Sequence, residues 1–234
     1  MDIQDLDVLA YEQTPIGGIC LQQRGMEGDP TRRVTEITLD HQFLMSSHST
    51  WSERKLAERG LELCAGEGLR VLVGGLGLGY TAREVLRSSR VGKLEVVELL
   101  APVIGWLERG LLPLAKDLRG DPRLEVVNGD VFGRLSGEAS AEFDLLLIDV
   151  DHSPEERLGE TSESFYEEAG LRKMALHLAP GGIFGFWSYA ESPRFEAGLR
   201  NVFPEVWAEP LTFHNEVIQD DETNWLYFAK KPTS

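Results

Sequence analysis

Glycines and carboxylates that follow apolar segments are the residues of this chain best suited to chemistry. Four glycines fall within the six residues Gly74-Gly75-Leu76-Gly77-Leu78-Gly79, directly after the apolar run VLV. Glycine permits positive φ and lets a ligand approach the backbone, and the predicted helix that follows begins with free N–H groups. We therefore predict that Gly75, Gly77 and Gly79 contact a ligand. The alternative is a tight strand-to-helix turn that binds nothing.

Two acidic residues end the next predicted strands. Glu98 closes the segment VVE, where its carboxylate can accept both ribose hydroxyls of a nucleoside. Asp130 closes VVNGD and is placed to accept from the exocyclic amine of adenine, with Val131 and Phe132 near the ring. Glu98 could instead be a solvated strand-end acid, and Asp130 a turn or cap residue.

A third acidic group, in the segment DVDHSP, follows the strongly apolar LLLI. Asp149 and Asp151 alternate along an extended backbone, so that one can point into a site while the other supports the loop. Such a carboxylate can orient or deprotonate a nucleophile. His152 is a candidate second base, although a loop histidine is more often exposed to solvent. The alternative for the whole segment is a helix cap followed by a polar loop.

The elements that must position these residues alternate between strand and helix. Continuous apolar strands alternating with helices predict an α/β fold, a doubly wound Rossmann-like sheet of seven mostly parallel strands. The last two strands have no room for a helix between them, so we predict an antiparallel edge hairpin. The predicted strands are Gly18–Gln22, Val34–Leu39, Gln42–Met45, Leu69–Val73, Lys93–Val97, Leu124–Val127, Asp144–Ile148, Gly182–Trp187, Val206–Leu211 and Trp225–Lys230. The predicted helices are 50–64, Tyr80–Ser88, Ala101–Leu114, Phe165–Leu178 and Arg194–Val202.

The N-terminal part reads differently. Residues 1–48 are expected to form a small β-hairpin segment, with a polar turn at Arg24–Arg33, and residues 49–234 the ligand-binding catalytic domain. Thr50 and Glu53 match a capping box at the start of the first helix.

Composition excludes several classes of function. A net charge of −16 argues against a nucleic-acid partner. The chain has no apolar run long enough for a bilayer and its N-terminus does not resemble a signal peptide, so we expect a cytoplasmic protein without a membrane partner. The two cysteines, Cys20 and Cys64, form no CxxC pair, and we expect no metal site.

A dinucleotide site is the nearest competing interpretation. Gly77-x-Gly79-x-x-Ala82 formally fits the GxGxxG/A fingerprint of nicotinamide oxidoreductases. However, the preceding strand ends at Gly74, so that Gly77 comes late for the first glycine of that motif.

Strand-GGLGLG-helix, VVE, NGD, FDLLLID and LAPGGIFGFW, in this order, resemble the class I S-adenosylmethionine-dependent methyltransferase fold, and more narrowly the spermidine synthase (aminopropyltransferase) family. The resemblance runs roughly from Thr14 to Lys231. It implies a catalytic Asp149, with Asp151 beside it, ribose contact by Glu98 and adenine contact by Asp130. It also implies a gate over 151–164 and a possible homodimer.

The chain departs from this family where an amine would bind. Leu78 stands at the aspartate of the family's GGGDGG loop, and only Glu53 remains of its DExxYHE segment, which holds the polyamine and the cofactor tail. Trp187 stands where a glutamine is usual, and DSxDP has become DVDHSP. We therefore expect an acceptor that is less charged than putrescine, or aromatic, near His48, Leu78, His152 and Trp187.

The predicted function is group transfer from an adenosyl sulfonium to a small-molecule nucleophile. Methyl transfer from S-adenosylmethionine is the leading hypothesis. The alternatives are aminopropyl transfer from decarboxylated S-adenosylmethionine and a protein that binds adenosyl metabolites without turnover.

Overall fold

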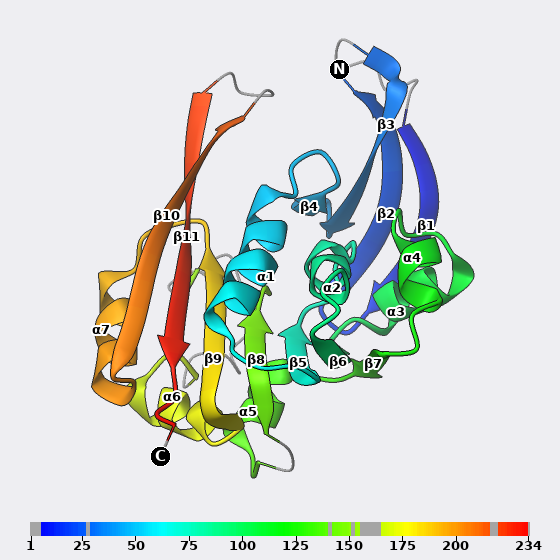
Figure 1. Ribbon diagram of the computed structural model, residues 1–234. Coiled ribbons are helices and arrows are strands. Elements are labelled where there is room, and N and C mark those ends of the chain that lie inside the picture. The colour runs from blue at the N-terminus through cyan, green and yellow to red at the C-terminus, as the bar shows by residue number, and fades with distance from the viewer. Residues whose placement is uncertain are drawn as a thin grey trace.

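The computed structural model contains two β-sheets (Figure 1), and it describes residues 6–26, 29–139, 142–150, 153–154, 165–215 and 220–233. A four-stranded antiparallel sheet of order β1-β2-β3-β4 comes first in the chain. A seven-stranded sheet of order β10-β11-β9-β8-β5-β6-β7 follows. Within it the neighbouring strands β9, β8, β5, β6 and β7 pair in parallel, and β11 is antiparallel to both β9 and β10. The predicted fold class and edge hairpin are confirmed.

The strands are β1 Leu6–Thr14, β2 Gly17–Met26, β3 Asp29–Leu39, β4 Gln42–Ser46, β5 Leu69–Gly74, β6 Val91–Glu98, β7 Leu124–Asn128, β8 Phe143–Ile148, β9 Leu178–Ser188, β10 Glu205–Asn215 and β11 Asp220–Lys230. The helices are α1 Trp51–Leu63, α2 Tyr80–Leu86, α3 Ala101–Arg109, α4 Ala115–Arg119, α5 Val131–Ser136, α6 Glu168–Ala175 and α7 Pro193–Val202.

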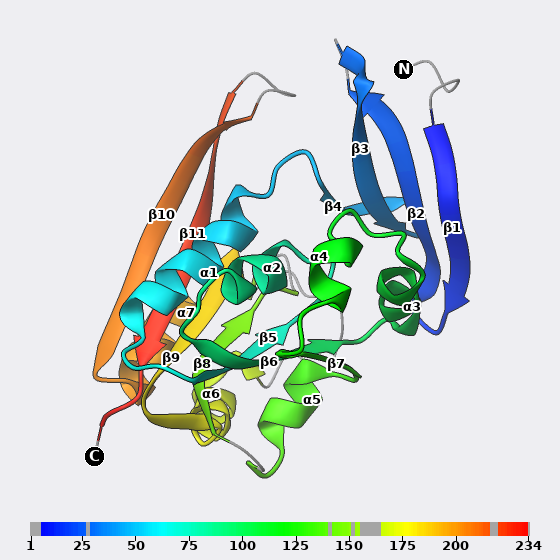
Figure 2. The same cartoon turned by 45° about the vertical axis from the view of Figure 1, so that its right-hand side comes forward.

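Helices cover both faces of the large sheet, because its central strands are apolar on both sides. In β5, Val71 and Val73 pack into the core that contains α1 to α4, whereas Leu72 packs into the core that contains α5 to α7. This alternation follows from the twofold period of a strand. The two helical layers can be followed in Figure 2.

The topology fixes where a ligand can bind. The chain leaves β5 toward β6 on one side, while β8 pairs with β5 on the other. In open α/β sheets such a switch point opens a crevice beyond the carboxyl ends of the strands. Backbone hydrogen bonds connect the ends of the strands there: Gly75 N–H donates to Val97 O at 2.9 Å, and Asp149 N–H to Gly74 O at 3.1 Å.

The prediction for the N-terminal residues was incomplete, and its polar turn was wrong in extent. Strand β1 was not predicted, and β2 and β3 continue into the segment expected to be a turn. Arg24 and Glu36 form an ion pair across the two strands at 2.8 Å. Where charged residues of β2 and β3 pair with each other across the strands, the sequence lacks the apolar alternation by which a strand is recognised. The pattern therefore did not show how far these two strands extend.

Two helix predictions also change. The predicted helix 101–114 ends at Arg109, because Gly110 adopts φ 77°, and the chain turns before α4. The predicted helix 165–178 is confined to α6, and β9 already begins at Leu178. Helices α4 and α5 were not predicted.

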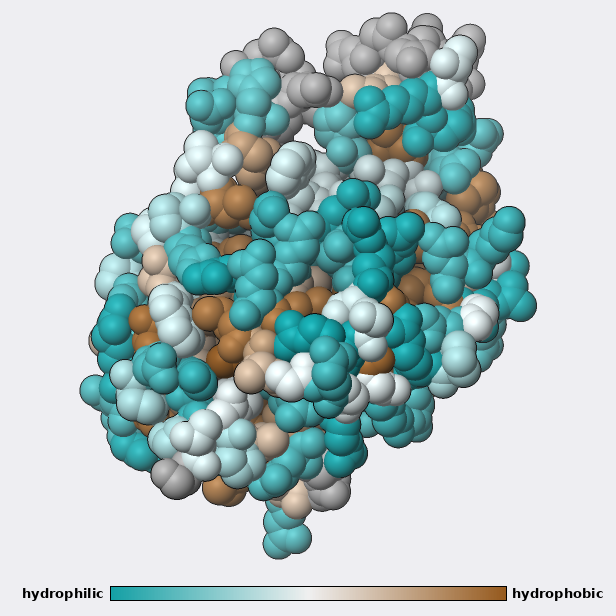
Figure 3. Space-filling view, in the orientation of Figure 1, coloured by the Kyte–Doolittle hydropathy of each residue, from teal (hydrophilic) through white to brown (hydrophobic). Residues whose placement is uncertain are grey.

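Two long hairpins extend beyond the body of the molecule on the same side, β2–β3 from the small sheet and β10–β11 from the large one (Figure 1). The space-filling view shows an open notch between them and a mostly hydrophilic surface (Figure 3). Among the helices in the described ranges, none combines the length and hydropathy needed to cross a bilayer.

Candidate active site

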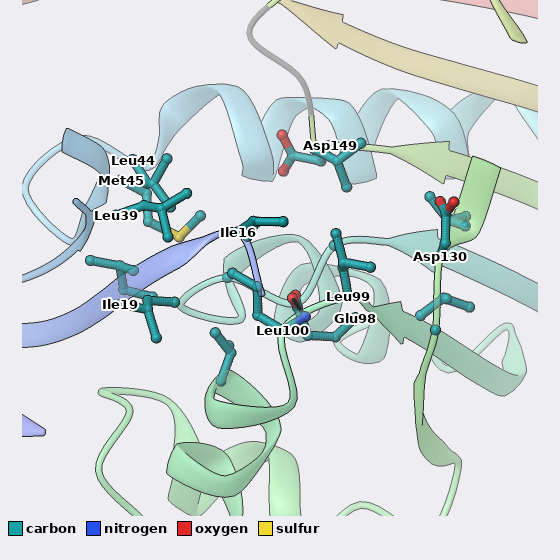
Figure 4. Close-up of a pocket in the computed structure, with 18 of the residues that line it drawn as sticks. Ile16, Ile19, Leu39, Leu44, Met45, Glu98, Leu99, Leu100, Asp130 and Asp149 are labelled. Atoms are coloured by element: carbon teal, nitrogen blue, oxygen red, sulfur yellow. Dashed lines mark hydrogen bonds between the residues drawn. The ribbon is translucent and has the colours of Figure 1, made fainter. Parts of the chain in front are cut away.

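A cavity, here called the first cavity, lies at the carboxyl ends of β5, β6 and β8, between the two sheets. One wall carries polar groups from the loops of the large sheet, and Figure 4 shows Glu98, Asp130 and Asp149 around it. The opposite wall is apolar and comes from the small sheet. Its side chains belong to Ile16, Ile19, Ile37, Leu39, Leu44 and Met45.

Glu98 organises the loop at the end of β5. Its two carboxylate oxygens accept the backbone N–H of Leu76 at 2.8 Å and of Leu100 at 2.7 Å. The residue is 7% exposed, and burial raises the pKa of its carboxyl group while these N–H donors lower it. The backbone N–H groups of Gly77 and Leu99 also lower this pKa, so Glu98 would accept ligand hydroxyls only at the lone pairs that these donors leave. The ribose role stays a prediction.

The glycine loop uses backbone conformations that favour glycine. Gly75 has φ 94°, Gly77 φ 51° and Gly79 φ 93°. A Cβ atom on Gly75 would lie 2.5 Å from the backbone oxygen of Asp149, and one on Gly77 would lie 2.6 Å from Met45 Sδ. Gly75 and Gly77 line the first cavity. The turn geometry therefore requires these glycines. Because Gly75 and Gly77 have no side chain, their backbone atoms can be approached from the first cavity.

Replacing Gly75 by alanine is expected to lower the free energy of unfolding by about 2–4 kcal/mol, because backbone strain and a backbone collision add. Gly66→Ala is the matched control: Gly66 has φ 92°, but its Cβ would meet nothing within 4 Å. It should cost only about 1 kcal/mol. Urea unfolding of both variants measures the difference. Equal losses would show that the contact with Asp149 carries no cost.

Asp130 caps helix α5. Its Oδ1 accepts the backbone N–H of Phe132 at 2.9 Å, which is the cap interpretation that the sequence left open. Asp130, Val131 and Phe132 also line the first cavity. Capping uses one carboxylate oxygen, and adenine contact through the other stays a prediction.

A second cavity adjoins the first, and the residues that line both are Leu44, Met45, Gly75, Gly77, Asp149 and Val150. It brings together three residues that the sequence placed near a ligand or acceptor: Leu78, Gly79 and Trp187. It adds residues that were not predicted as site residues: Ser52, Glu53, Tyr80 and Thr81. Glu53 was expected as a capping-box residue and as the last remnant of a family segment, and nothing in the sequence pointed to Thr81.

Asp149 and Glu53 give this second cavity its charge. Asp149 Oδ2 accepts a hydrogen bond from Thr81 Oγ1 at 2.8 Å, and burial raises the pKa of Asp149 to about 6. Burial and the charge of Asp149 raise the pKa of Glu53 to about 7, although Ser52 Oγ donates to its Oε2 at 3.0 Å. The expected capping box is wrong: Thr50 makes no side-chain cap bond, and the Glu53 side chain lines the cavity.

Three predicted residues are not brought into the cavities by the described part of the chain. Asp151 and His152 lie outside the described residues, as does most of the expected gate 151–164. His48 is half-buried and lines neither cavity. Its buried Nδ1 has no hydrogen-bond partner among the described residues.

The two cavities together suit a nucleoside that carries a cationic tail. The first offers an apolar slot beside the carboxylates of Glu98, Asp130 and Asp149, and the second adds the carboxylate of Glu53. Asp149 lies where they join. A cation that binds beside half-buried acids such as Glu53 and Asp149 stabilises their charged form.

Comparison with known proteins identifies relatives of this chain. Residues 54–199 match the model of the spermine/spermidine synthase domain. A polyamine aminopropyltransferase of Prochlorococcus marinus is 33% identical over 168 residues, which cover 70% of this chain and 55% of that protein. A putrescine N-methyltransferase of Nicotiana tabacum is 27% identical over 114 residues, which cover 49% of this chain and 29% of that protein.

A crystal structure of spermidine synthase in complex with the transition-state analogue AdoDATO superposes with a TM-score of 0.75 at 21% identity. The match covers 97% of this chain and 74% of that one, and at this identity it bears on the fold. This chain spans about half or less of the length of the curated relatives it matches. The domain match extends over most of the chain, which therefore belongs to the spermine/spermidine synthase family.

Proposed function

We propose that this protein transfers an aminopropyl group from decarboxylated S-adenosylmethionine to an amine. The observation that carries the proposal is the pair of carboxylates, Glu53 and Asp149, in the cavity that would receive the donor's tail. The carboxylate of intact S-adenosylmethionine would face both of them, and like charges repel strongly in a poorly solvated site. A decarboxylated tail ends in an ammonium group that both attract.

The rest of the donor fits the first cavity. Glu98 is placed for the ribose hydroxyls, and the apolar wall of the small sheet covers the space for adenine beside Asp130. Asp149, at the junction of the cavities, would lie near the sulfonium, and Glu53 near the terminal ammonium. Both positive charges of the donor then have a partner.

In the proposed reaction the acceptor nitrogen attacks the carbon of the aminopropyl group that is bonded to sulfur. A C–N bond forms, the C–S bond breaks, and its electron pair stays on sulfur, which becomes the neutral thioether of methylthioadenosine. Asp149 accepts the proton that the acceptor nitrogen must lose. Its pKa of about 6 brings it nearer than an exposed aspartate to the best range for a general base at neutral pH. Proximity and in-line orientation supply most of the acceleration.

The preference for methyl transfer that came from the sequence is not retained as the leading proposal. The relatives with the higher identities are named aminopropyltransferases, and the cavity is acidic where the carboxylate of S-adenosylmethionine would lie. Methyl transfer remains the second candidate because putrescine N-methyltransferases also match this chain.

Calorimetric titration with decarboxylated S-adenosylmethionine, S-adenosylmethionine and methylthioadenosine tests the proposal. We expect the decarboxylated donor to bind at least about tenfold tighter than the intact cofactor, since a tenfold ratio needs only about 1.4 kcal/mol. Incubation with a mixture of amines should then release methylthioadenosine. Tighter binding of the intact cofactor, with release of S-adenosylhomocysteine, would favour methyl transfer. Binding of all three without any product would favour the non-catalytic alternative.

A further inference from the structure

We infer that Asn224 is a positioning residue, which binds the indole of Trp187 and thereby fixes one wall of the site where the acceptor amine lies. This inference rests on the proposed function and concerns the same site. Asn224 belongs to β11 and was not among the site residues that the sequence predicted. It acts on the acceptor through Trp187, whose side chain lines the second cavity.

Trp187 and Asn224 lie on neighbouring antiparallel strands. In the register of β9 and β11, Trp187 lies opposite Leu226, and Asn224 comes two residues before Leu226 on the same face of the sheet. Such diagonal neighbours are within reach of an aromatic side chain. Trp187 Nε1 donates to Asn224 Oδ1 at 3.2 Å, and this bond restricts the rotation of the indole.

The bond also decides which part of the indole faces the second cavity. An indole has a single N–H donor, and in Trp187 it is directed at Asn224. The ring therefore presents its carbon atoms to the cavity. Such a surface packs against an alkyl chain, and its face attracts an ammonium group, so it suits both parts of an amine. An indole free to rotate would also turn its N–H toward the cavity, where an ammonium group cannot accept it.

The order of the strands places Trp187 on the acceptor's side of the donor. The proposed donor runs across the large sheet, from its ribose at Glu98, the last residue of β6, to its sulfonium beside Asp149, which follows β8. Strand β9 is the next strand beyond β8, and Trp187 lies at its carboxyl end. In-line displacement requires the nucleophile on the side of the carbon opposite sulfur. The acceptor therefore lies toward β9, beside Trp187.

Asn224→Leu tests the inference, because leucine has a similar size but no oxygen to accept the indole N–H. The acceptor is whichever of putrescine, cadaverine, spermidine, n-butylamine and phenethylamine the unmodified protein uses fastest with decarboxylated S-adenosylmethionine. We expect KM for this amine to rise about tenfold, with kcat and the affinity for methylthioadenosine within about threefold. Asn224→Asp keeps an oxygen for the N–H, and KM should rise by no more than about threefold. If Asn224→Leu does not bind methylthioadenosine, Asn224→Ala replaces it.

A double-mutant cycle shows whether Asn224 acts through the indole. Phenylalanine has no N–H, so in a Trp187→Phe background Asn224→Leu should change KM for the amine by less than about twofold. Thr223→Val is the control for loosening of the β10–β11 hairpin. It removes the bond between the hydroxyls of Thr212 and Thr223, 2.9 Å apart, on the face of β11 opposite to Asn224. It should leave KM within about twofold.

The outcomes separate this inference from the function on which it rests. Aminopropyl transfer with an unchanged KM in Asn224→Leu would overturn the role of Asn224 and leave the function intact. The same increase of KM in Asn224→Asp, in Thr223→Val or in the Trp187→Phe background would overturn it as well. Donor binding with no transfer to any of these amines would overturn the proposed function, and this inference with it.

Discussion

Asp149→Asn is expected to lower kcat about 100-fold to 1000-fold, while methylthioadenosine binds within about threefold of its original affinity. Asparagine keeps the size of the side chain and can still bond to Thr81, but it cannot take a proton from the acceptor nitrogen. Methylthioadenosine carries neither the sulfonium nor the aminopropyl group, so its affinity reports whether the first cavity is intact. Pre-steady-state quenching and calorimetry measure the two quantities.

Thr81→Val is the matched control for this variant. It removes the hydroxyl group that donates to Asp149 Oδ2 but keeps the carboxylate and the side-chain volume. Loss of that donor should raise the pKa of Asp149 further, since the hydrogen bond lowers it. The pH at which kcat reaches half of its maximum should therefore move upward, with a much smaller loss of kcat above it. A similar loss of kcat and of methylthioadenosine affinity in Asp149→Asn would instead assign Asp149 to binding.

The sequence predicted the large sheet because its central strands are buried on both faces and are therefore continuously apolar. Segments such as Leu69–Val73 and Asp144–Ile148 need no knowledge of their neighbours to be recognised. Parallel strands end at one edge, so residues that follow them meet in space. In the structure Gly75, Glu98, Asp130 and Asp149 line one cavity, and their roles toward a ligand stay predictions.

The rest of the site depends on packing between distant segments. The apolar wall comes from the small sheet, and no sequence pattern around Leu39 or Met45 predicts that these side chains line the same cavity as Glu98. Thr81 faces Asp149 only because α2 starts beside the end of β8. The capping-box pattern assigned Glu53 to the start of α1, but its side chain lines the second cavity instead. The domain boundary at residue 48, the homodimer and the cytoplasmic location stay predictions.

Glu53→Gln is expected to weaken binding of the decarboxylated donor about 10-fold to 100-fold while leaving methylthioadenosine within about twofold. The reason is that only the donor has an ammonium for Glu53 to bind, and a charged partner in such a site is worth about 1.5–3 kcal/mol. In the unmodified protein, donor affinity should rise as the pH increases through about 6 to 7, because Asp149 and Glu53 then lose their protons. The Glu53→Gln variant should lose the part of this dependence near pH 7. Glu67→Gln, which removes an exposed acid just after α1, is the control for net charge.

Glu53→Gln should also make the ligand-free protein more stable. The pKa of Glu53 is raised from 4.5 to about 7, so the folded state holds a proton that the unfolded state releases between these pH values. The contribution of Glu53 to the free energy of unfolding is therefore present below about pH 4.5 and is lost as the pH rises to about 7. Glutamine removes that loss, and the free energy of unfolding at pH 8 should rise by about 1–3 kcal/mol, with little change at pH 4.5. Urea unfolding at the two pH values measures it. A gain in stability together with a loss of donor affinity would mean that Glu53 is kept for its charge at the expense of the fold, as expected for a residue that binds substrate. A loss of stability at pH 8 would mean that its carboxylate serves the fold instead.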